Sequence, residues 1–196
     1  MAIQLDDGAR TSTPVVKRTK IGEKFVGAIV RFEQRNVLKD GEPVLKPNGK
    51  PRQELVVHCI TMPGTTATAG IGDNVGVPAP GDAVRLILRG KAFGDWIEAK
   101  GKLGALTVGD LVATVVDHAQ AYNADGSPKG VPITDQAAAD AIPRGTTVGF
   151  YGPLKLAKGI DATWIQAAER AYHAATAIVL EEAAASPADD DPFAGL

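Results

Sequence analysis

The chain has 196 residues, of which 44% are hydrophobic and 22% charged, a composition typical of a globular domain with a sizeable core. No run reaches the roughly 18 apolar residues of a transmembrane helix, and the first residues, MAIQLDDGARTSTP, lack the apolar segment of a secretory signal. The single cysteine, Cys59, excludes an internal disulfide and a multi-cysteine zinc site. We therefore expect a cytoplasmic protein built from one domain with additions, or from at most two small domains.

Residues 1–20 are polar and predict a flexible N-terminal arm. The stretch KFVGAIVRFEQRNVL, which begins at Lys24, is rich in β-branched and aromatic residues and predicts a long first strand. Alternation with a period of two predicts two different faces. One face holds Val26, Ala28, Val30 and Phe32, and the other holds Phe25, Gly27, Ile29, Arg31, Glu33 and Arg35. Gly27 within the run indicates a bulge or sharp coiling.

Turn signals separate this strand from the next two. The dipeptides Asp-Gly at 40–41 and Asn-Gly at 48–49 predict a projecting hairpin loop, and RQELVVHCIT predicts a second strand. Residues 62–81 are rich in Gly, Pro and Thr and predict a long loop. A third strand follows, with Val84, Leu86 and Leu88 on one face and Arg85, Ile87 and Arg89 on the other. Two glycines interrupt this strand before it resumes at Trp96.

The last third of the chain predicts two more strands and two helices. LTVGDLVATVVDHAQAY and GTTVGFYG indicate strands, NADGSPKGVP a loop, and ITDQAAADAIP a short helix stopped by Pro143. A long helix begins at Asp161, a suitable N-cap residue, and ends before Pro187. Its apolar stripe consists of Trp164, Ala168, Ala171, Tyr172, Ala175, Ile178 and Val179. Glycines at strand bends, without strand–helix–strand alternation, predict a small closed or partly open β-barrel.

Residue patterns of catalysis are weak. None of the serines lies in a G-x-S-x-G turn, and AGIGDNVGV lacks the third glycine of a dinucleotide fingerprint. Cys59 and its neighbour His58 should point to opposite faces of their strand, which argues against a catalytic pair. No metal-ligand spacing is present. We therefore expect no enzymatic activity, cofactor or metal.

Binding chemistry is better supported, because basic residues outnumber acidic ones between Pro14 and Ile60. Such a segment is either a solvated face or a surface for a polyanion. The candidates for phosphate contacts are Arg31, Arg35, Lys39, Lys46, Lys50, Arg52, Arg85, Arg89 and Lys91. Aromatic rings beside cations can stack on unpaired bases. The candidates for stacking are Phe93, Trp96 and Tyr122, and for each of them packing in the core is an equal alternative.

The C-terminal residues ASPADDDPFAGL form an acidic segment with one aromatic ring. They resemble the C-terminal tip of bacterial and phage single-stranded DNA-binding proteins. The matching residues are Asp189, Asp190, Asp191, Pro192 and Phe193. In that family an OB-fold body binds DNA, while the tip recruits replication and repair enzymes and competes with DNA for the basic groove. The size and the insertions of the chain resemble a phage-encoded version.

Together these features predict a mainly β protein, an OB-like barrel of five or six strands with long loops and a C-terminal helix. Its expected parts are a flexible arm (1–20), an OB-like nucleic-acid-binding domain (21–155), a helix (156–185) and a disordered acidic tail (186–196). The long helix should pack on the barrel or on another subunit of a homo-oligomer.

The implied function is sequence-nonspecific binding of single-stranded DNA in phage DNA replication, recombination or repair, within the cytoplasm of a bacterial host. The expected partners are single-stranded DNA and, through the tail, replication or recombination proteins; no membrane is involved. The alternative is a structural protein of a phage virion or tail assembly that contains a small β-barrel. An enzyme, or a protein that binds duplex DNA or RNA, remains a third class.

Overall fold

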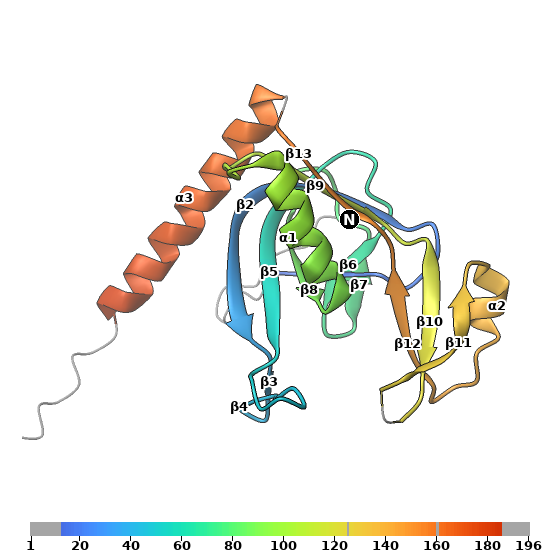
Figure 1. Cartoon of the computed structure of the whole chain (residues 1–196). Coiled ribbons are helices and arrows are strands. Elements are labelled where there is room, and N and C mark those ends of the chain that lie inside the picture. The colour runs from blue at the N-terminus through green and yellow to red at the C-terminus, as the bar shows by residue number, and fades with distance from the viewer. Residues whose placement is uncertain (1–12, 125, 160, 186–196) are drawn as a thin grey trace, which may run out of the picture.

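The computed structural model describes residues 13–124, 126–159 and 161–185. Within these ranges the protein is mainly β with a long C-terminal helix, as the sequence predicts (Figure 1). Three long strands form an antiparallel meander at its centre. They are β2 (Lys24–Asn36), β5 (Gln53–Thr61) and β8 (Ala83–Arg89).

Shorter strands extend this meander on both sides into one eight-stranded sheet, in the order β13-β9-β2-β5-β8-β1-β6-β7. The added strands are β9 (Leu111–Val115), β13 (Leu154–Ala157), β1 (Val15–Lys17), β6 (Thr68–Ile71) and β7 (Asn74–Gly76). β13 and β7 are the two ends of this order, so in the described part of the chain the strands are not closed into the predicted barrel. Helix α1 (Lys91–Leu103) instead lies between β8 and β13 and contacts both.

The main core fills the space between the central strands and α1. The predicted alternation of β8 is confirmed, because Val84, Leu86 and Leu88 are all buried in this core. Leu55, Val57 and Cys59 face them from β5, and Trp96 comes from α1 with only 2% of its surface exposed. Cys59 is therefore a core residue, and burial raises the pKa of its thiol.

Residues 96–99 belong to α1, and the predicted return to a strand at Trp96 is wrong. Gly90 has a φ of 53°, in the left-handed region that favours glycine, and the chain changes from strand to helix there. Two ion pairs join consecutive turns of the helix, Lys91–Asp95 at 2.8 Å and Lys102–Glu98 at 2.6 Å. Ala92 and Trp96 are the buried residues of this helix. Their burial on one helix face outweighs the strand propensity of Trp96 and Ile97.

A β-bulge in β2 corrects the predicted faces of this strand. The register against β5 shifts between Ile29, opposite Cys59, and Arg31, opposite His58. The extra residue reverses the alternation, so Phe32 points to the same side as Ile29 and lies 5.6 Å from Trp96 in an edge-to-face contact. Phe32 was predicted on the face of Val26, and Arg31 on the face of Ile29. In the structure the predicted faces are reversed from Arg31 onward, so Glu33 and Arg35 also lie on the side opposite to Ile29.

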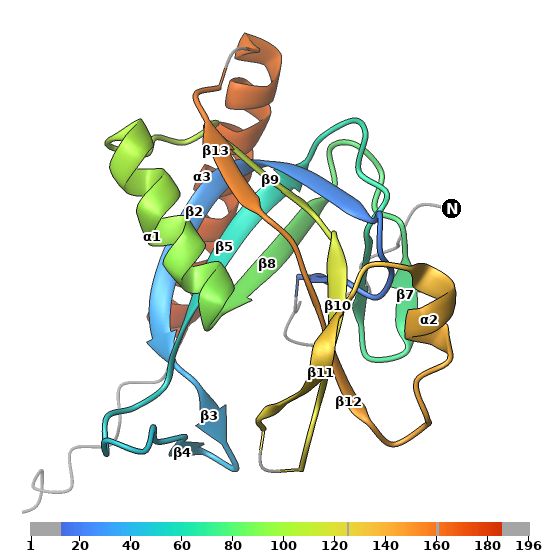
Figure 2. The same ribbon diagram turned by 45° about the vertical axis from the view of Figure 1, so that its right-hand side comes forward.

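Two projections, here called the hairpin arm and the sheet arm, leave the body on the same side (Figure 2). The hairpin arm is residues 37–53 and contains β3 (Leu38–Lys39) and β4 (Glu42–Pro43). The sheet arm is residues 118–151 and contains β10 (His118–Tyr122), β11 (Pro128–Ile133), α2 (Gln136–Asp140) and β12 (Thr147–Tyr151). The first was predicted as a projecting hairpin loop, and the second as the end of one strand, a loop, a short helix and a further strand. The single strand predicted over residues 106–122 is divided in the structure into β9, in the main sheet, and β10, in the sheet arm.

Three predicted irregular segments contain strands. Residues 15–17, assigned from sequence to the N-terminal arm, form β1, which runs parallel to β8 and antiparallel to β6. The predicted loop 62–81 contains the hairpin of β6 and β7, and the predicted loop after Tyr122 contains most of β11. The four strands in these segments are short, and their pairing partners lie elsewhere in the chain or across a tight turn, so their local sequence gives little signal.

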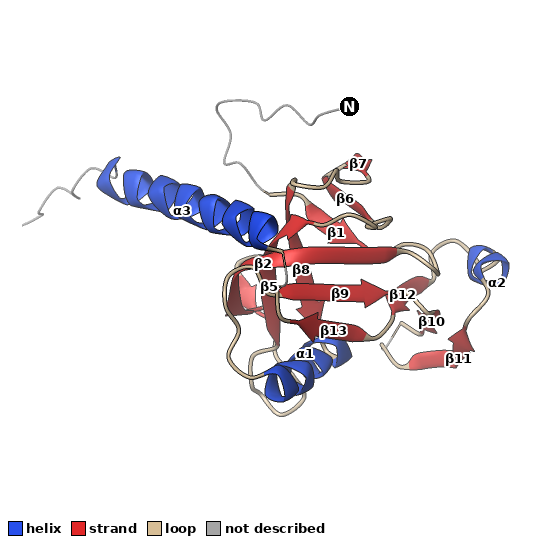
Figure 3. Cartoon of the chain, turned by 90° about the horizontal axis from the view of Figure 1, so that it is seen from above, coloured by secondary structure: helices blue, strands red, loops and turns tan. Residues whose placement is uncertain are grey.

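Helix α3 (Ala162–Ala185) covers the face of the sheet opposite α1. Asp161 is its N-cap as predicted, because Asp161 Oδ1 accepts a hydrogen bond from the backbone N–H of Thr163 at 2.8 Å. Trp164, Ala168 and Ala171 pack on Ala28, Val30 and Ile60. Figure 3 shows that the rest of the helix extends beyond the edge of the sheet.

Replacing Trp96 with Ala should lower the free energy of unfolding by about 3–5 kcal/mol, because a fully buried aromatic ring is lost from the main core. Ile97→Ala on the same helix is the matched control, since Ile97 is 59% exposed, and it should change stability by no more than about 0.5 kcal/mol. Urea unfolding followed by circular dichroism measures both. Equal losses in the two variants would contradict the packing described for α1.

Candidate nucleic-acid interface

A groove of about 1240 Å³ lies between the hairpin arm and the sheet arm. Val44, Pro47 and Asn48 line it from the hairpin arm, and Val148 and Gly149 from the sheet arm. β1 and the residue that follows it, the end of β8 and the first turn of α1 also contribute to the lining. Segments from both halves of the chain therefore form one concave surface.

The lining of this groove combines cations with aromatic rings. The cations are Arg18, Lys46, Arg52, Arg89 and Lys91, and the rings are Phe93, Tyr122, Phe150 and Tyr151. Six of these residues were predicted as site residues from the sequence, and the structure brings them together: Lys46, Arg52, Arg89, Lys91, Phe93 and Tyr122. Such a lining can hold phosphates electrostatically and bases by stacking.

Sequence reasoning missed Arg18, Phe150 and Tyr151. Arg18 was counted among the basic residues of the N-terminal arm, and only the pairing of β1 with β8 carries it into the groove. Burial lowers the pKa of its guanidinium, which shows that this charge is partly withdrawn from water. Phe150 and Tyr151 lie in the predicted strand GTTVGFYG, where two adjacent aromatic residues were the available signal.

The aromatic residues of the sheet arm are ordered by the pairing of β10 with β12. Tyr122 Oη donates a hydrogen bond to Tyr151 Oη at 2.7 Å, and the ring of His118 stacks on that of Tyr151 at 5.7 Å. Gly149 makes room for this arrangement, because a Cβ at that position would lie 2.4 Å from the hydroxyl of Tyr151. Burial, the hydrogen bond from Tyr122 and its proximity raise the pKa of Tyr151 to about 12, so the phenol is neutral at physiological pH.

Trp96 does not take part in this surface. It was a candidate for base stacking, but its ring is buried in the main core against Phe32. Phe93, one turn earlier in α1, is partly buried against the same core and also lines the groove. Trp96 therefore packs in the core, whereas Phe93 packs against the core and also borders the groove.

Lys39 and Lys50 are exposed on the hairpin arm but are not part of the groove lining. Lys91 lines the groove while its ammonium is bound to Asp95. Asp189, Asp190, Asp191, Pro192 and Phe193 lie outside the described residues.

The four arginines predicted on strand faces occupy one side of the sheet, which we call the outer face because α1 and the main core lie on the other side. Arg35, Glu54 and Arg89 form a row across β2, β5 and β8. The carboxylate of Glu54 is 4% exposed and accepts hydrogen bonds from Arg35 Nε at 2.7 Å and from Arg89 Nε at 2.5 Å. Burial alone raises the pKa of Glu54, but the two guanidinium groups outweigh it and hold the pKa below its usual value.

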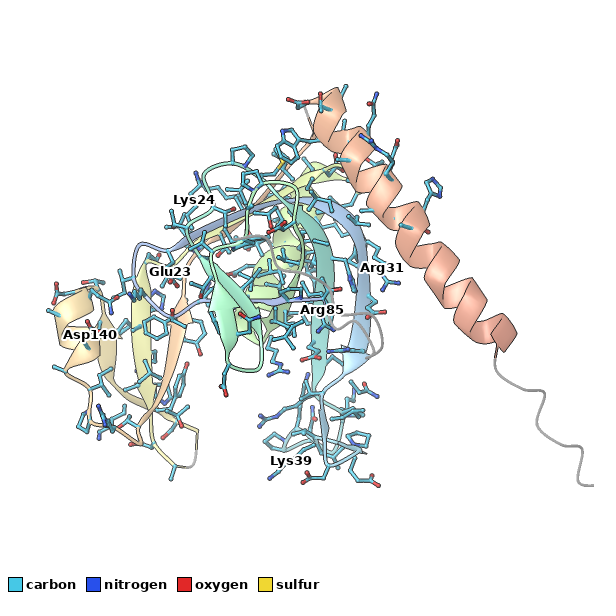
Figure 4. All side chains as sticks on the ribbon, turned by 180° about the vertical axis from the view of Figure 1, so that it is seen from behind. Glu23, Lys24, Arg31, Lys39, Arg85 and Asp140 are labelled. Carbon is cyan, nitrogen blue, oxygen red and sulfur yellow. The ribbon has the colours of Figure 1, made fainter. Side chains whose placement is uncertain are left out.

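A second row, Arg31–His58–Arg85, crosses the same three strands on the outer face. In Figure 4 the molecule is seen from behind, and Arg31 and Arg85 lie on this side of the sheet. Arg85 Nε donates a hydrogen bond to the carbonyl oxygen of Thr13 at 3.0 Å. Burial and the positive charge of Arg31, only partly offset by Glu33, lower the pKa of His58 to about 4, so its imidazole is neutral near pH 7.

Neither a metal centre nor a membrane-spanning helix is indicated by the described residues. Within those ranges no three His, Cys, Asp or Glu side chains are grouped so that they could hold a metal ion. No helix there is long and apolar enough to cross a membrane. Compared with protein-family models, with curated proteins and with solved structures, the chain matches none.

The pKa of His58 predicts how stability depends on pH. Because its pKa is about 4 in the folded protein and about 6.5 for an ordinary histidine in an unfolded chain, the unfolded chain binds the proton first as the pH falls. The free energy of unfolding should therefore decrease between pH 6.5 and pH 4.5. The decrease should be smaller in His58→Gln and unchanged in His173→Gln, whose side chain is exposed on α3. Urea unfolding at a series of pH values measures this, and identical slopes in all three proteins would contradict it.

Proposed function

We propose that the protein binds single-stranded DNA without sequence preference, in the replication, recombination or repair of phage DNA. The observation that carries this proposal is the groove between the two arms, which joins five cations to four aromatic rings. Cations can neutralise successive phosphates of a strand, whatever its sequence. Aromatic rings stack on unpaired bases of any kind, with about 1–3 kcal/mol per base.

The order of the strands supports an OB-like interpretation of the open sheet. β2, β5 and β8 are a three-stranded meander, α1 follows the third strand, and β9 returns to pair with the beginning of β2. The hairpin arm then connects the first and second strands of this unit, and the sheet arm connects the fourth strand, β9, to the fifth, β13. In OB-folds, loops at these two positions flank the oligonucleotide-binding face.

A single strand suits this groove better than a duplex. The bases of a duplex are stacked on one another and turned inward, so they are not available to Tyr122 or Phe93. A single strand can present its bases to these rings while its phosphates reach Lys46, Arg52 and Arg89. We infer that the two arms hold the strand between them.

The direct test is fluorescence anisotropy with a labelled oligo(dT) at several salt concentrations. We expect binding that weakens as salt rises. The logarithm of the binding constant should fall against the logarithm of the salt concentration with a slope of about −0.7 for each phosphate neutralised. The protein should clearly prefer single-stranded to duplex DNA. Arg52→Ala should reduce the magnitude of the slope by about 0.7. Lys155→Ala is the control with the same loss of charge, because Lys155 is exposed on β13 outside the groove, and it should leave the slope unchanged.

No binding at low salt would contradict the proposal. If the protein also sedimented as rings or tubes, the result would favour the alternative of a structural protein of the phage particle. Equal affinity for duplex and single strand would indicate a cationic surface without the stacking contribution.

The proposal includes the acidic tail, on the strength of its sequence. Five acids and no bases follow residue 180, opposite in sign to the groove lining. We propose that Asp189 to Asp191 compete with DNA for the groove and that replication or recombination proteins bind Phe193.

Deletion of residues 188–196 should tighten binding of oligo(dT), because an internal polyanionic competitor is removed. The gain should be greatest at low salt and vanish at high salt. Replacing the three aspartates with asparagine should reproduce it, whereas Phe193→Ala should not. An unchanged affinity after deletion would contradict competition by the tail. Recruitment of partners would then have to be tested separately.

A further inference from the structure

The row Arg31–His58–Arg85 on the outer face contains a guanidinium nitrogen and an imidazole nitrogen that are both buried. Among the described residues, neither Arg31 Nε nor His58 Nε2 has a hydrogen-bond partner, and both atoms are buried. Glu33 Oε1 lies 3.8 Å from His58 Nε2, beyond hydrogen-bond distance, and the Glu33 side chain is 49% exposed. A buried polar atom without a partner costs about 1–3 kcal/mol, so each such atom requires an explanation, and a bound ion is one such explanation.

The charges around His58 favour an anion at this place. From β2 it is faced by Arg31 and Glu33, and from β8 by Arg85. α3 packs on the same face through Trp164, Ala168 and Ala171, and its nearby charged side chains, Glu169 and Arg170, are exposed. In the neighbouring row the charge of Glu54 is already taken by Arg35 and Arg89. The two arginines Arg31 and Arg85 therefore lower the pKa of His58, and the half-exposed carboxylate of Glu33 opposes them only in part.

The position of the row connects it with the proposed DNA groove. Arg85 and Arg89 point to the same face of β8, and Ile87, between them, lines the groove together with Arg89. Four residues of a strand span about 13 Å. A nucleic acid strand that leaves the groove along β8 would therefore bring its next phosphates to Arg85 and Arg31.

We propose that the Arg31–His58–Arg85 row binds a phosphate group and that His58 takes up a proton from solvent when the phosphate binds. Arg31 Nε and His58 Nε2 then donate hydrogen bonds to phosphate oxygens, and Arg85 contributes its charge and its remaining guanidinium donors. The claim that the row binds a phosphate of single-stranded DNA rests on the proposed function. The claim that it binds free oligophosphate does not depend on that function.

Proton uptake by His58 makes the affinity for phosphate depend on pH. The free row holds His58 neutral, and the bound row holds it protonated, so the complex carries more protons than the free protein. Affinity must then rise as the pH falls. The rise is up to tenfold per pH unit between the pKa of His58 without phosphate, about 4, and its higher pKa when phosphate is bound. The same direction does not follow from Arg31 or Arg85, which stay charged over this range.

The experiment has two arms that distinguish the sources of phosphate. In the first, the imidazole resonances of His58 in the full chain are followed by NMR while inorganic tripolyphosphate, and separately oligo(dT), is added at pH 6. We expect His58 to change from the neutral to the protonated signature with both ligands, and the exposed His173 to stay unchanged. The response to tripolyphosphate should be lost in Arg31→Gln.

In the second arm, affinity for oligo(dT) is measured from pH 7.5 to pH 5.5 with the wild type, His58→Gln and the control His173→Gln. The wild type and the control should bind more tightly by up to tenfold per pH unit as the pH falls, and His58→Gln should show a clearly weaker dependence. Circular dichroism of each variant confirms that it is folded.

The outcomes separate this inference from the proposed function. If His58 stays neutral with both ligands and His58→Gln keeps the wild-type pH dependence while DNA still binds, the phosphate row is overturned and the proposed function stands. If tripolyphosphate protonates His58 but oligo(dT) does not bind, the row is an anion site and the proposed function fails.

Discussion

The arrangement of the whole molecule depends on β2, because this one strand pairs with β5 along most of its length and with β9 at its beginning. The hairpin arm joins β2 to β5, and the sheet arm continues from β9 through β10, so both arms are held by partners of the same strand. The bulge after Ile29 decides what each half of β2 faces. In a regular strand Arg31 would enter the core face and Phe32 would lose its contact with Trp96.

Charge is distributed over two surfaces with different chemistry. In the groove between the arms, cations stand beside aromatic rings and face open space, which suits a flexible polyanion. On the outer face, the buried carboxylate of Glu54 pairs with both Arg35 and Arg89, so these two arginines stabilise the sheet and the row keeps one positive charge in excess. Among the described residues, no carboxylate lies at hydrogen-bond distance from Arg31 or Arg85, and these two arginines flank a neutral histidine. Arginines on the same face of the sheet therefore differ in their interactions, because Arg35 and Arg89 have Glu54 as a cross-strand neighbour and Arg31 and Arg85 have His58.

Much of the fold could be predicted, since alternation of buried and exposed residues is a local signal. It identified β5, β8 and the two helices that follow Pro132, and it placed Val84, Leu86 and Leu88 in the core. The errors came from competition between local and distant interactions. Trp96 has the propensity of a strand residue but lies in a helix because its ring fills the core. One inserted residue near Val30 reversed the faces of β2, and an insertion of that kind leaves no clear mark in the sequence.

Residue type and spacing were enough to predict a mainly β protein with a C-terminal helix, a basic front segment and the six groove residues from Lys46 to Tyr122, because composition and short periods are properties of neighbouring residues. They could not show that Arg18 and Tyr151 meet in one groove, that Glu54 holds two arginines, or that Arg31, His58 and Arg85 form a row. These juxtapositions arise only when strands distant in the chain pair in a particular register, and register depends on how the whole core packs.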